Sequence, residues 1–250
     1  MKDINILGIK ISAVDRRQTL ERAKEILEGG DFRYFATVNP EFLLAAGRDR
    51  EFARILNGAD LGLCDGFGLK LAGLTFGARL PRVTGADLLV DLLTLCAKMG
   101  KRVLVVNWRG GLSSGEEIKN CLEVMVDRLE LEVIDIDRRG KMFDPGAAAA
   151  FRPELALVAL GAPWQEKFIH HRLSHIPGLR MAVGVGGAID FATGKARRAP
   201  RIFRRLGLEW LWRLARQPRR VKRIFNAVVV FPLKFLWWRF SSFFSTKQAQ

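Results

Sequence analysis

Short apolar runs of strand length alternate along this chain with segments of helical periodicity. The clearest helical segments are 19–27 and 86–99, where apolar residues recur at intervals of three and four. The apolar runs are nearly continuous, which is typical of strands that are buried on both faces of a parallel sheet. They lie at 33–38, 61–64, 103–106, 131–136, 155–160 and 181–185. The alternation therefore predicts an α/β fold, with helices on both faces of a parallel sheet.

Positive charge is concentrated toward the C-terminus. Between Lys195 and Arg239 the sequence has 14 Lys and Arg residues and a single acid, Glu209, whereas the rest of the chain has 27 basic and 25 acidic residues. We therefore predict an α/β domain over about 1–196 and a basic C-terminal appendage over about 197–250. A segment this basic indicates an acidic partner, either a membrane surface or a nucleic acid.

The appendage contains two apolar segments. Residues 202–216 have apolar positions at helical spacing among many arginines, which predicts an amphipathic helix. Residues 224–240 are apolar and aromatic, but they include Pro232 and Lys234 and fall short of the roughly 20 residues that cross a bilayer. We therefore expect 224–240 to lie in the membrane interface, and deeper insertion is left open.

The cysteines and the first residues both favour a cytoplasmic location. Cys64, Cys96 and Cys121 are odd in number and form no CxxC pair, which fits a reducing compartment. The strand-like run 3–14 begins almost at once, so no signal peptide is predicted.

Polar and glycine residues gather where four of the predicted strands end. They are Thr37, Asn39, Asp65, the loop of Gly161, Pro163, Gln165 and Glu166, and the glycines Gly184, Gly186 and Gly187 with Asp190. In a doubly wound sheet, ligands bind beyond the carboxyl ends of the strands. Each group alone can be explained as the cap of the following helix. Their shared position at one edge predicts a common site.

Asp65 is the strongest candidate for chemistry at this edge. It follows an apolar strand, and the nearby glycines Gly66 and Gly68 leave room for a ligand. A carboxylate in this position is suited to take a proton from an attacking hydroxyl. The alternative is that Asp65 only caps the helix that follows.

The remaining motifs are weaker. The glycines at 161 and 186–187 allow backbone N–H groups to face a diphosphate, although neither a GxGxxG nor a Walker pattern is present. His170, His171 and His175 cluster without an HExxH pattern, so a solvated helix face explains them better than a metal site. We predict no metal and no other cofactor.

Several motifs then occur in a characteristic order. They are TVNP at 37–40, DGFG at 65–68, RVTG at 82–85, GAPWQEK at 161–167, GVGG at 184–187, GKARRAP at 194–200 and GLEWLWRL at 207–214. From about residue 4 to residue 223 the chain resembles the WecG/TagA/CpsF family of bacterial glycosyltransferases. The resemblance implies a Rossmann-like fold and metal-independent, inverting transfer. It also implies that N-acetylmannosamine or its uronic acid moves from UDP to undecaprenyl-diphosphate-linked N-acetylglucosamine, in teichoic acid or common-antigen synthesis.

The resemblance also implies roles for individual residues. Asp65 resembles the catalytic base, and Thr37 and Asn39 resemble groups that position donor or acceptor. Arg82 resembles a cation that stabilises the diphosphate leaving group. The implied donor-binding residues are Gly161, Pro163, Gln165, Glu166, Gly186 and Asp190. The implied lipid-diphosphate-binding residues are Arg213, Arg219, Arg220 and Arg223.

The chain departs from the family pattern at two places, and the second of them leaves the donor sugar open. The turn at 107–111 replaces a Gly-Gly turn, and 140–143 replaces a Gly-Tyr-Phe step. The implied partners are a UDP-sugar, a polyprenyl-diphosphate-linked acceptor and the anionic inner face of the cell membrane, to which the protein is peripheral. No nucleic acid is implied, and a homo-oligomer is left open.

Two rival functions start from the same sequence. The basic tail is compatible with a nucleic-acid-binding protein. Sedimentation with anionic vesicles would favour a membrane-binding tail, and a gel shift of duplex DNA at physiological salt would favour nucleic-acid binding. The fold is compatible with another nucleotide-binding α/β protein such as a dehydrogenase, which the missing GxGxxG disfavours.

Overall fold

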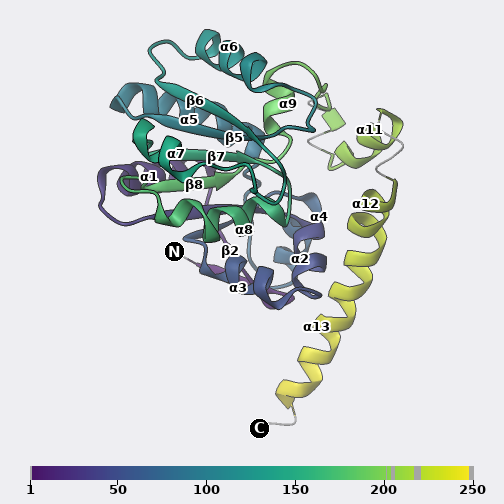
Figure 1. The fold of residues 1–250 in the computed structure, drawn as a ribbon. Helices are drawn as coiled ribbons and strands as arrows, with labels where there is room; N and C mark the ends of the chain where they lie inside the picture. Colours follow the sequence, from purple (N-terminus) through teal and green to yellow (C-terminus); the bar gives the residue numbers. More distant parts are fainter. Residues whose placement is uncertain (1, 201, 204–205, 217–220, 248–250) are drawn as a thin grey trace.

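The chain folds around a parallel sheet that is covered by helices (Figure 1). The structure, a computed structural model, describes residues 2–200, 202–203, 206–216 and 221–247. In these residues six parallel strands run in the order β4-β3-β8-β7-β5-β6. They are β3 (Arg33–Val38), β4 (Leu61–Cys64), β5 (Val103–Trp108), β6 (Leu131–Ile136), β7 (Leu155–Ala159) and β8 (Met181–Gly184). The predicted strands and the α/β fold are therefore confirmed.

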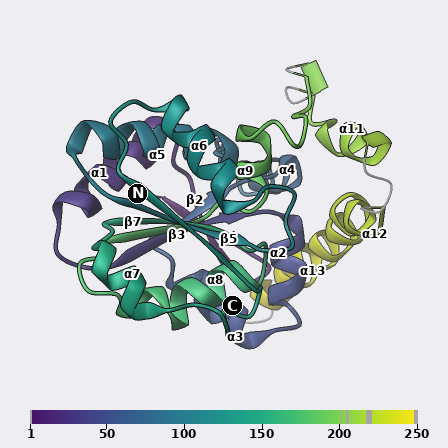
Figure 2. The same cartoon turned by 45° about the horizontal axis from the view of Figure 1, so that its top comes forward.

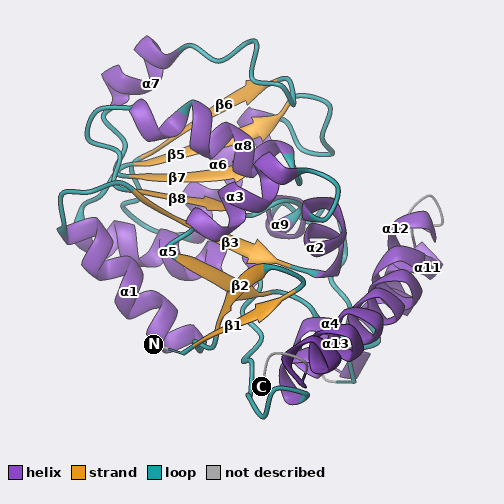
Figure 3. Ribbon diagram, turned by 90° about the horizontal axis from the view of Figure 1, so that it is seen from below, coloured by secondary structure: helices purple, strands orange, loops and turns teal. Residues whose placement is uncertain are grey.

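An antiparallel hairpin covers one end of this sheet. Strands β1 (Asp3–Ile6) and β2 (Ile9–Ser12) pair with each other, and Figure 3 shows them beyond β3 at one end of the row of strands. β2 lies so close to β4 that a Cβ atom on Gly62 would be 2.3 Å from the backbone oxygen of Lys10. Only glycine fits there, so the edge strand β4 is covered by the hairpin rather than exposed.

Two apolar cores fill opposite faces of the sheet. Along β5, Val103 and Val105 belong to one core and Leu104 and Val106 to the other, because side chains alternate along a strand. The first face is covered by α1 (Arg16–Glu28), α5 (Gly85–Met99), α6 (Gly115–Met125) and α9 (Ala188–Ala192). The second is covered by α2 (Pro40–Ala46), α3 (Arg50–Gly58), α7 (Pro145–Phe151) and α8 (Trp164–His171). This layering leaves the carboxyl ends of the strands accessible.

Local capping sets the helix boundaries. Helix α5 begins after Thr84, whose side chain accepts a hydrogen bond from the backbone of Asp87, and it ends at Gly100 in the left-handed conformation. The structure therefore confirms the predicted stop at Gly100. Helix α1 starts three residues before the predicted position, because Asp15 and Gln18 form a capping box.

The C-terminal part forms helices that lie on one side of the molecule beside α2 and α4 (Phe67–Leu74) (Figure 2). They are α11 (Glu209–Arg216), α12 (Val221–Phe225), the π-helical turn η3 (Asn226–Val230) and α13 (Phe231–Lys247). By length and composition the continuous stretch Val221–Ser241 is sufficient to cross a membrane. The predicted apolar run 224–240 lies within this stretch, which adds residues 221–223 and Ser241 to it.

One side of this long helix packs on the α/β domain. Phe231 and Phe235 are almost fully buried and belong to the same core as α2 and α4. Phe76 contacts the rings of Phe235 and Trp238. On its other side α13 exposes large apolar side chains, among them Trp237 at 75% exposure. Unlike a typical amphipathic helix, α13 is thus apolar on both its packed and its exposed side.

Candidate active site

A cavity of about 190 Å³ lies at the carboxyl ends of β3, β4, β7 and β8. We name it the strand-end cavity. Its wall includes Thr37, Asn39, Asp65 and Arg82, together with residues from the loops after β7 and β8. Segments far apart in the sequence thus meet at the edge where ligands bind in doubly wound sheets.

Thr37 and Asn39 each have a structural role as well as a place in this wall. The Thr37 hydroxyl donates a hydrogen bond of 2.9 Å to the backbone oxygen of Gly184, which ties the ends of β3 and β8 together. The side chain of Asn39 caps α2 by accepting from the backbone N–H groups of Glu41 and Phe42. The cap interpretation therefore holds for Asn39, and the same residue lines the cavity.

Asp65 does not cap the following helix. The N-cap of α4 is Gly66, while the backbone N–H of Asp65 donates to Val38 at 2.8 Å and continues the β3–β4 pairing. A Cβ atom on Gly66 would be 2.8 Å from the Cδ of Pro40, so glycine permits this close turn. The carboxylate of Asp65 is 25% exposed and lies in the wall of the cavity.

Arg82 links Asp65 to the C-terminal helices. Its Nη2 lies 3.8 Å from an Asp65 carboxylate oxygen and 2.6 Å from a carboxylate oxygen of Glu209 on α11. Burial lowers the pKa of Arg82, but the two carboxylates raise it by more, so the guanidinium stays charged. Among the described residues the buried Nε of Arg82 has no hydrogen-bond partner. A guanidinium in the wall of a cavity is suited to an anionic ligand.

The residues predicted to bind the donor separate into two groups. Gly161, Gln165, Gly186 and Asp190 line the strand-end cavity. Glu166 does not: it is fully buried beneath the wall, where its carboxylate accepts a 2.7 Å hydrogen bond from the Gln165 amide.

Burial has a clear electrostatic consequence for Glu166. Loss of solvent raises the pKa of its carboxyl group to about 7, since a charge is costly in an apolar environment. Pro163 also lies behind the cavity wall rather than in it, and its peptide bond with Ala162 is cis. Gly161 and Gln165 line the cavity, although Gln165 is almost fully buried, whereas Glu166 and Pro163 do not line it.

Of the arginines predicted to hold a lipid diphosphate, Arg223 can be placed. It lines the strand-end cavity, and its Nη2 lies 2.6 Å from a carboxylate oxygen of Glu41. Arg219 and Arg220 lie outside the described residues, and so does the side chain of Arg213.

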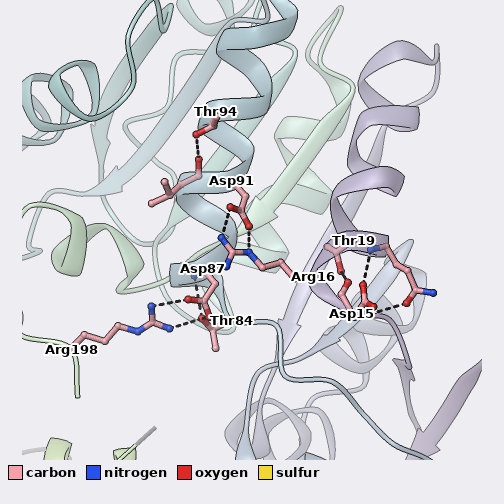
Figure 4. Close-up of polar contacts among 10 residues, drawn as sticks. Asp15, Arg16, Thr19, Thr84, Asp87, Asp91, Thr94 and Arg198 are labelled. Carbon is pink, nitrogen blue, oxygen red and sulfur yellow. Dashed lines mark hydrogen bonds and ion pairs between the residues drawn. The ribbon is translucent and has the colours of Figure 1, made fainter. Parts of the chain in front are cut away.

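Two further residues of the site were not anticipated as site residues. Arg198 lines the cavity and donates to Asp87 at 2.8 Å and to Thr84 at 3.1 Å (Figure 4). Burial raises the pKa of Asp87, but Arg198 and Thr84 lower it by more. Glu209 is the second unanticipated residue: it lines the cavity and accepts a hydrogen bond from Arg82. The sequence feature that could have identified it is that it is the single acid among 14 basic residues between Lys195 and Arg239.

Among the described residues, no group of three or more His, Cys, Asp or Glu side chains has a geometry that could hold a metal. His171 contacts Glu51 at 2.8 Å on the surface between α3 and α8. The cations in the described part of this wall are Arg82, Arg197, Arg198 and Arg223, and these are groups that it offers to an anion.

A base candidate beside buried guanidinium groups, at the strand ends of a Rossmann-like sheet, defines a group-transfer site for an anionic leaving group. Such a site fits a glycosyltransferase that uses a nucleotide sugar. Residues 4–244 match the Glycosyl transferase WecG/TagA/CpsF family, and the chain belongs to this family. It is therefore a transferase that acts on a sugar.

Two relatives from bacilli are similar over most of their length. The chain is 31% identical over 200 residues, 76% of this chain and 74% of the relative, to N-acetylglucosaminyldiphosphoundecaprenol N-acetyl-beta-D-mannosaminyltransferase of Bacillus subtilis strain 168. It is 30% identical over 204 residues, 77% of this chain and 75% of the relative, to the protein of the same name from Bacillus spizizenii strain W23.

Proposed function

We propose that this protein transfers N-acetylmannosamine, or a closely related amino sugar, from UDP to undecaprenyl-diphosphate-linked N-acetylglucosamine with inversion. The observation that carries the proposal is the position of Asp65, in the wall of the strand-end cavity and 3.8 Å from the Arg82 guanidinium. The names of the two relatives support this choice of donor and acceptor. The product would enter the synthesis of a cell-surface polysaccharide or a teichoic acid.

The proposed reaction is one displacement at the anomeric carbon. Asp65 takes the proton of the acceptor hydroxyl, whose oxygen attacks the anomeric carbon from the face opposite the nucleotide. The bond from that carbon to the phosphate oxygen breaks, and its electron pair leaves with UDP. Arg82 is placed to stabilise the charge that develops on this diphosphate. A single displacement inverts the anomeric configuration.

We assign the two substrates to different parts of the wall. Gly161 and Gly186 come from the loops after β7 and β8, and Gln165 and Asp190 come from the helices α8 and α9 that follow these loops. Together they provide backbone and polar side-chain groups for the donor. Arg223 comes from α12 and is placed for the diphosphate of the acceptor. Arg213, Arg219 and Arg220 are proposed to act with it, as the family resemblance implies.

We propose that the protein binds the inner face of the cell membrane peripherally. Basic residues near an anionic surface contribute about 1 kcal/mol each, and the exposed apolar side of α13 adds hydrophobic area. The burial of Phe231 and Phe235 against the α/β domain supports this arrangement, because a spanning helix would have to leave that core. Extraction by alkaline carbonate separates the two: a peripheral protein is released and a spanning one is retained.

A donor screen tests the reaction. Purified protein is given several UDP-sugars and a short-chain prenyl-diphosphate-linked N-acetylglucosamine, with and without EDTA. We expect transfer from UDP-N-acetylmannosamine in both conditions, and an inverted linkage by NMR. If transfer occurs only from other UDP-sugars and not from UDP-N-acetylmannosamine, the proposed donor is wrong. Loss of activity on chelation, restored by Mg²⁺ or Mn²⁺, would contradict stabilisation of the leaving group by arginine.

A further inference from the structure

A second cavity, of about 200 Å³, shares part of its wall with the strand-end cavity. It lies between α4 and the α12–η3 segment, and we name it the α4–α12 cavity. Asp65, Arg82, Glu209 and Arg223 line both cavities. A molecule in the second cavity is therefore within reach of Asp65, and the loops after β7 and β8 do not line this cavity.

The walls that belong to the α4–α12 cavity alone are largely apolar. Its own apolar side chains are Pro40, Phe67, Trp210, Ile224, Ala227 and Val228. Small residues complete this wall: a Cβ atom on Gly207 would be 2.4 Å from the Phe67 ring, and one on Gly68 would be 3.3 Å from the Phe231 ring. Glu41, which pairs with Arg223, is the charged residue in this part of the wall, and the other charged residues of the cavity are those it shares with the strand-end cavity. The remaining wall is suited to hydrocarbon.

The π-helical turn η3 forms one side of this cavity. Ala227 and Val228 in this turn line it, whereas the neighbouring Val229 does not. Val228 and Val229 are almost equally exposed, at 36% and 38%. π-helical turns are rare in proteins, and those that occur are often found at functional sites. This turn presents Val228 to the cavity, and the similarly exposed Val229 lies outside it.

An apolar strip continues from the cavity along α4. Phe67 lines the cavity, and Leu71 and Leu74 follow at spacings that place them on the same side of the helix. Leu71 and Leu74 are about half exposed. A hydrocarbon chain that leaves the cavity along this side of α4 would cover apolar surface that now faces solvent.

We infer that the α4–α12 cavity binds the first isoprene units of the lipid-linked acceptor, and that the chain leaves along Leu71 and Leu74. The inference rests on the proposed function, which supplies an acceptor with a diphosphate between its sugar and its polyprenyl chain. The polar end of the cavity near Arg223 fits the diphosphate, and the apolar remainder fits the units attached to it. This cavity would then select for the lipid part of the acceptor.

Two acceptors that differ only in hydrocarbon length test the inference. Both carry diphosphate-linked N-acetylglucosamine, one on a farnesyl chain and the other on a methyl group, and KM and kcat are measured for each in the same detergent. We expect the wild-type protein to have the lower KM for the farnesyl acceptor. Val228→Asn should raise that KM about 10-fold, as expected when a polar group replaces an apolar contact of this size, and should leave the KM of the methyl acceptor within twofold.

Matched variants guard against indirect effects. Val229→Asn makes the same chemical change on the same turn but outside the cavity, and both KM values should stay at the wild-type level. Ala227→Leu fills the cavity instead of polarising it and should also raise only the farnesyl KM. Equal effects of Val228→Asn and Val229→Asn, or wild-type KM values independent of chain length, would overturn the inference. Absence of transfer to either acceptor would instead contradict the proposed function.

Discussion

The two sides of the strand-end cavity are built in different ways. The loops after β7 and β8 contribute Gly161 and Gly186, and the start of α8 contributes Gln165; all three are uncharged and lie within a few residues of a buried strand. The C-terminal helices contribute Glu209 and Arg223, which are charged and pair with residues 127 and 182 positions away in the sequence. The first side is fixed by the sheet itself, and the second depends on the docking of a separate segment.

This difference divides the chemistry between the two sides. Neutral, glycine-containing loops suit a nucleotide and a sugar, whose recognition relies on hydrogen bonds. Charged side chains on docked helices suit a diphosphate that arrives at a membrane surface. Asp65 and Arg82 lie where the two sides meet. Variants on each side should therefore affect different substrates, and variants at the junction should affect the chemical step.

The largest effect is expected at the junction. Asp65→Asn keeps the size of the side chain but removes the base, so kcat should fall by about 10²–10⁴-fold, the usual contribution of a positioned base. The dissociation constant of the UDP-sugar, measured by calorimetry, should stay within a few-fold of wild type. A near-normal kcat would exclude Asp65 as the base and leave the junction without a chemical role.

The next effect is expected on the docked side. Glu209→Gln removes the carboxylate that holds Arg82 at 2.6 Å, so Arg82 becomes free to pair with Asp65 and weaken it as a base. Hydrogen bonds to charged groups contribute about 1.5–3 kcal/mol, so kcat should fall roughly 10- to 100-fold with donor binding retained.

A matched control exists for Glu209→Gln. Glu117 forms an exposed 2.6 Å ion pair with Lys195, near the start of the C-terminal segment and away from the cavity. Glu117→Gln removes an ion pair of similar length and should leave kcat unchanged, because exposed pairs contribute little. Similar losses in the two variants would indicate that the C-terminal segment needs ion pairs only for docking.

The fold and the place of the site could be predicted because both depend on local patterns. Apolar runs such as 103–106 identify buried strands, and parallel strands bring their carboxyl ends to one edge. The cap interpretation of Asp65 was wrong because Gly66 takes that position. The sequence pattern could not decide between the two residues, since an aspartate at this spacing is also a common N-cap.

Other features depend on geometry that the sequence does not contain. Gln165 and Glu166 are neighbours in one motif, yet successive residues on a helix point about 100° apart, so one faces the cavity and the other the core. The pairing of Arg82 with Glu209 joins segments separated by 127 positions, and no local periodicity encodes such a contact. The predicted apolar run 224–240 does not mark the ends of the C-terminal helical stretch, which runs from Val221 to Lys247, because helical backbone continues into the residues on either side of the run.

A smaller effect is expected at the edge of the docked side. Arg223→Ala removes a cation that lines both cavities, and the KM of the lipid-linked acceptor should rise about 10-fold, the value of one charge-assisted hydrogen bond. Lys222 is on the same helix but lines neither cavity, so Lys222→Ala removes the same charge and should change that KM less than twofold. Equal changes in the two variants would mean that Arg223 acts only through the surface potential.

The smallest effect on turnover is expected beneath the strand-end side, at Glu166. Its Oε2 is buried without a hydrogen-bond partner among the described residues, and burial raises the pKa of this carboxyl to about 7, above the value of 4.5 that applies to the unfolded chain. Its contribution to stability is therefore fully present below pH 4.5 and is lost as the pH rises through 7. The glutamine of Glu166→Gln cannot ionise, so the pH dependence of stability should change. Because Glu166 does not line the cavity, kcat should stay within about twofold of wild type.

Denaturant titrations at pH 5, 6, 7 and 8 measure this change as the free energy of unfolding of Glu166→Gln minus that of wild type. The difference should become more positive with pH and gain about 1 kcal/mol by pH 8, less than the full pKa shift implies because the surroundings relax around the charge. Glu116→Gln makes the same substitution at an exposed position and serves as its control. A difference for Glu166→Gln that does not change with pH would mean that Glu166 is ionised in the folded protein throughout this range, and that the strand-end side tolerates a buried charge as the docked side does.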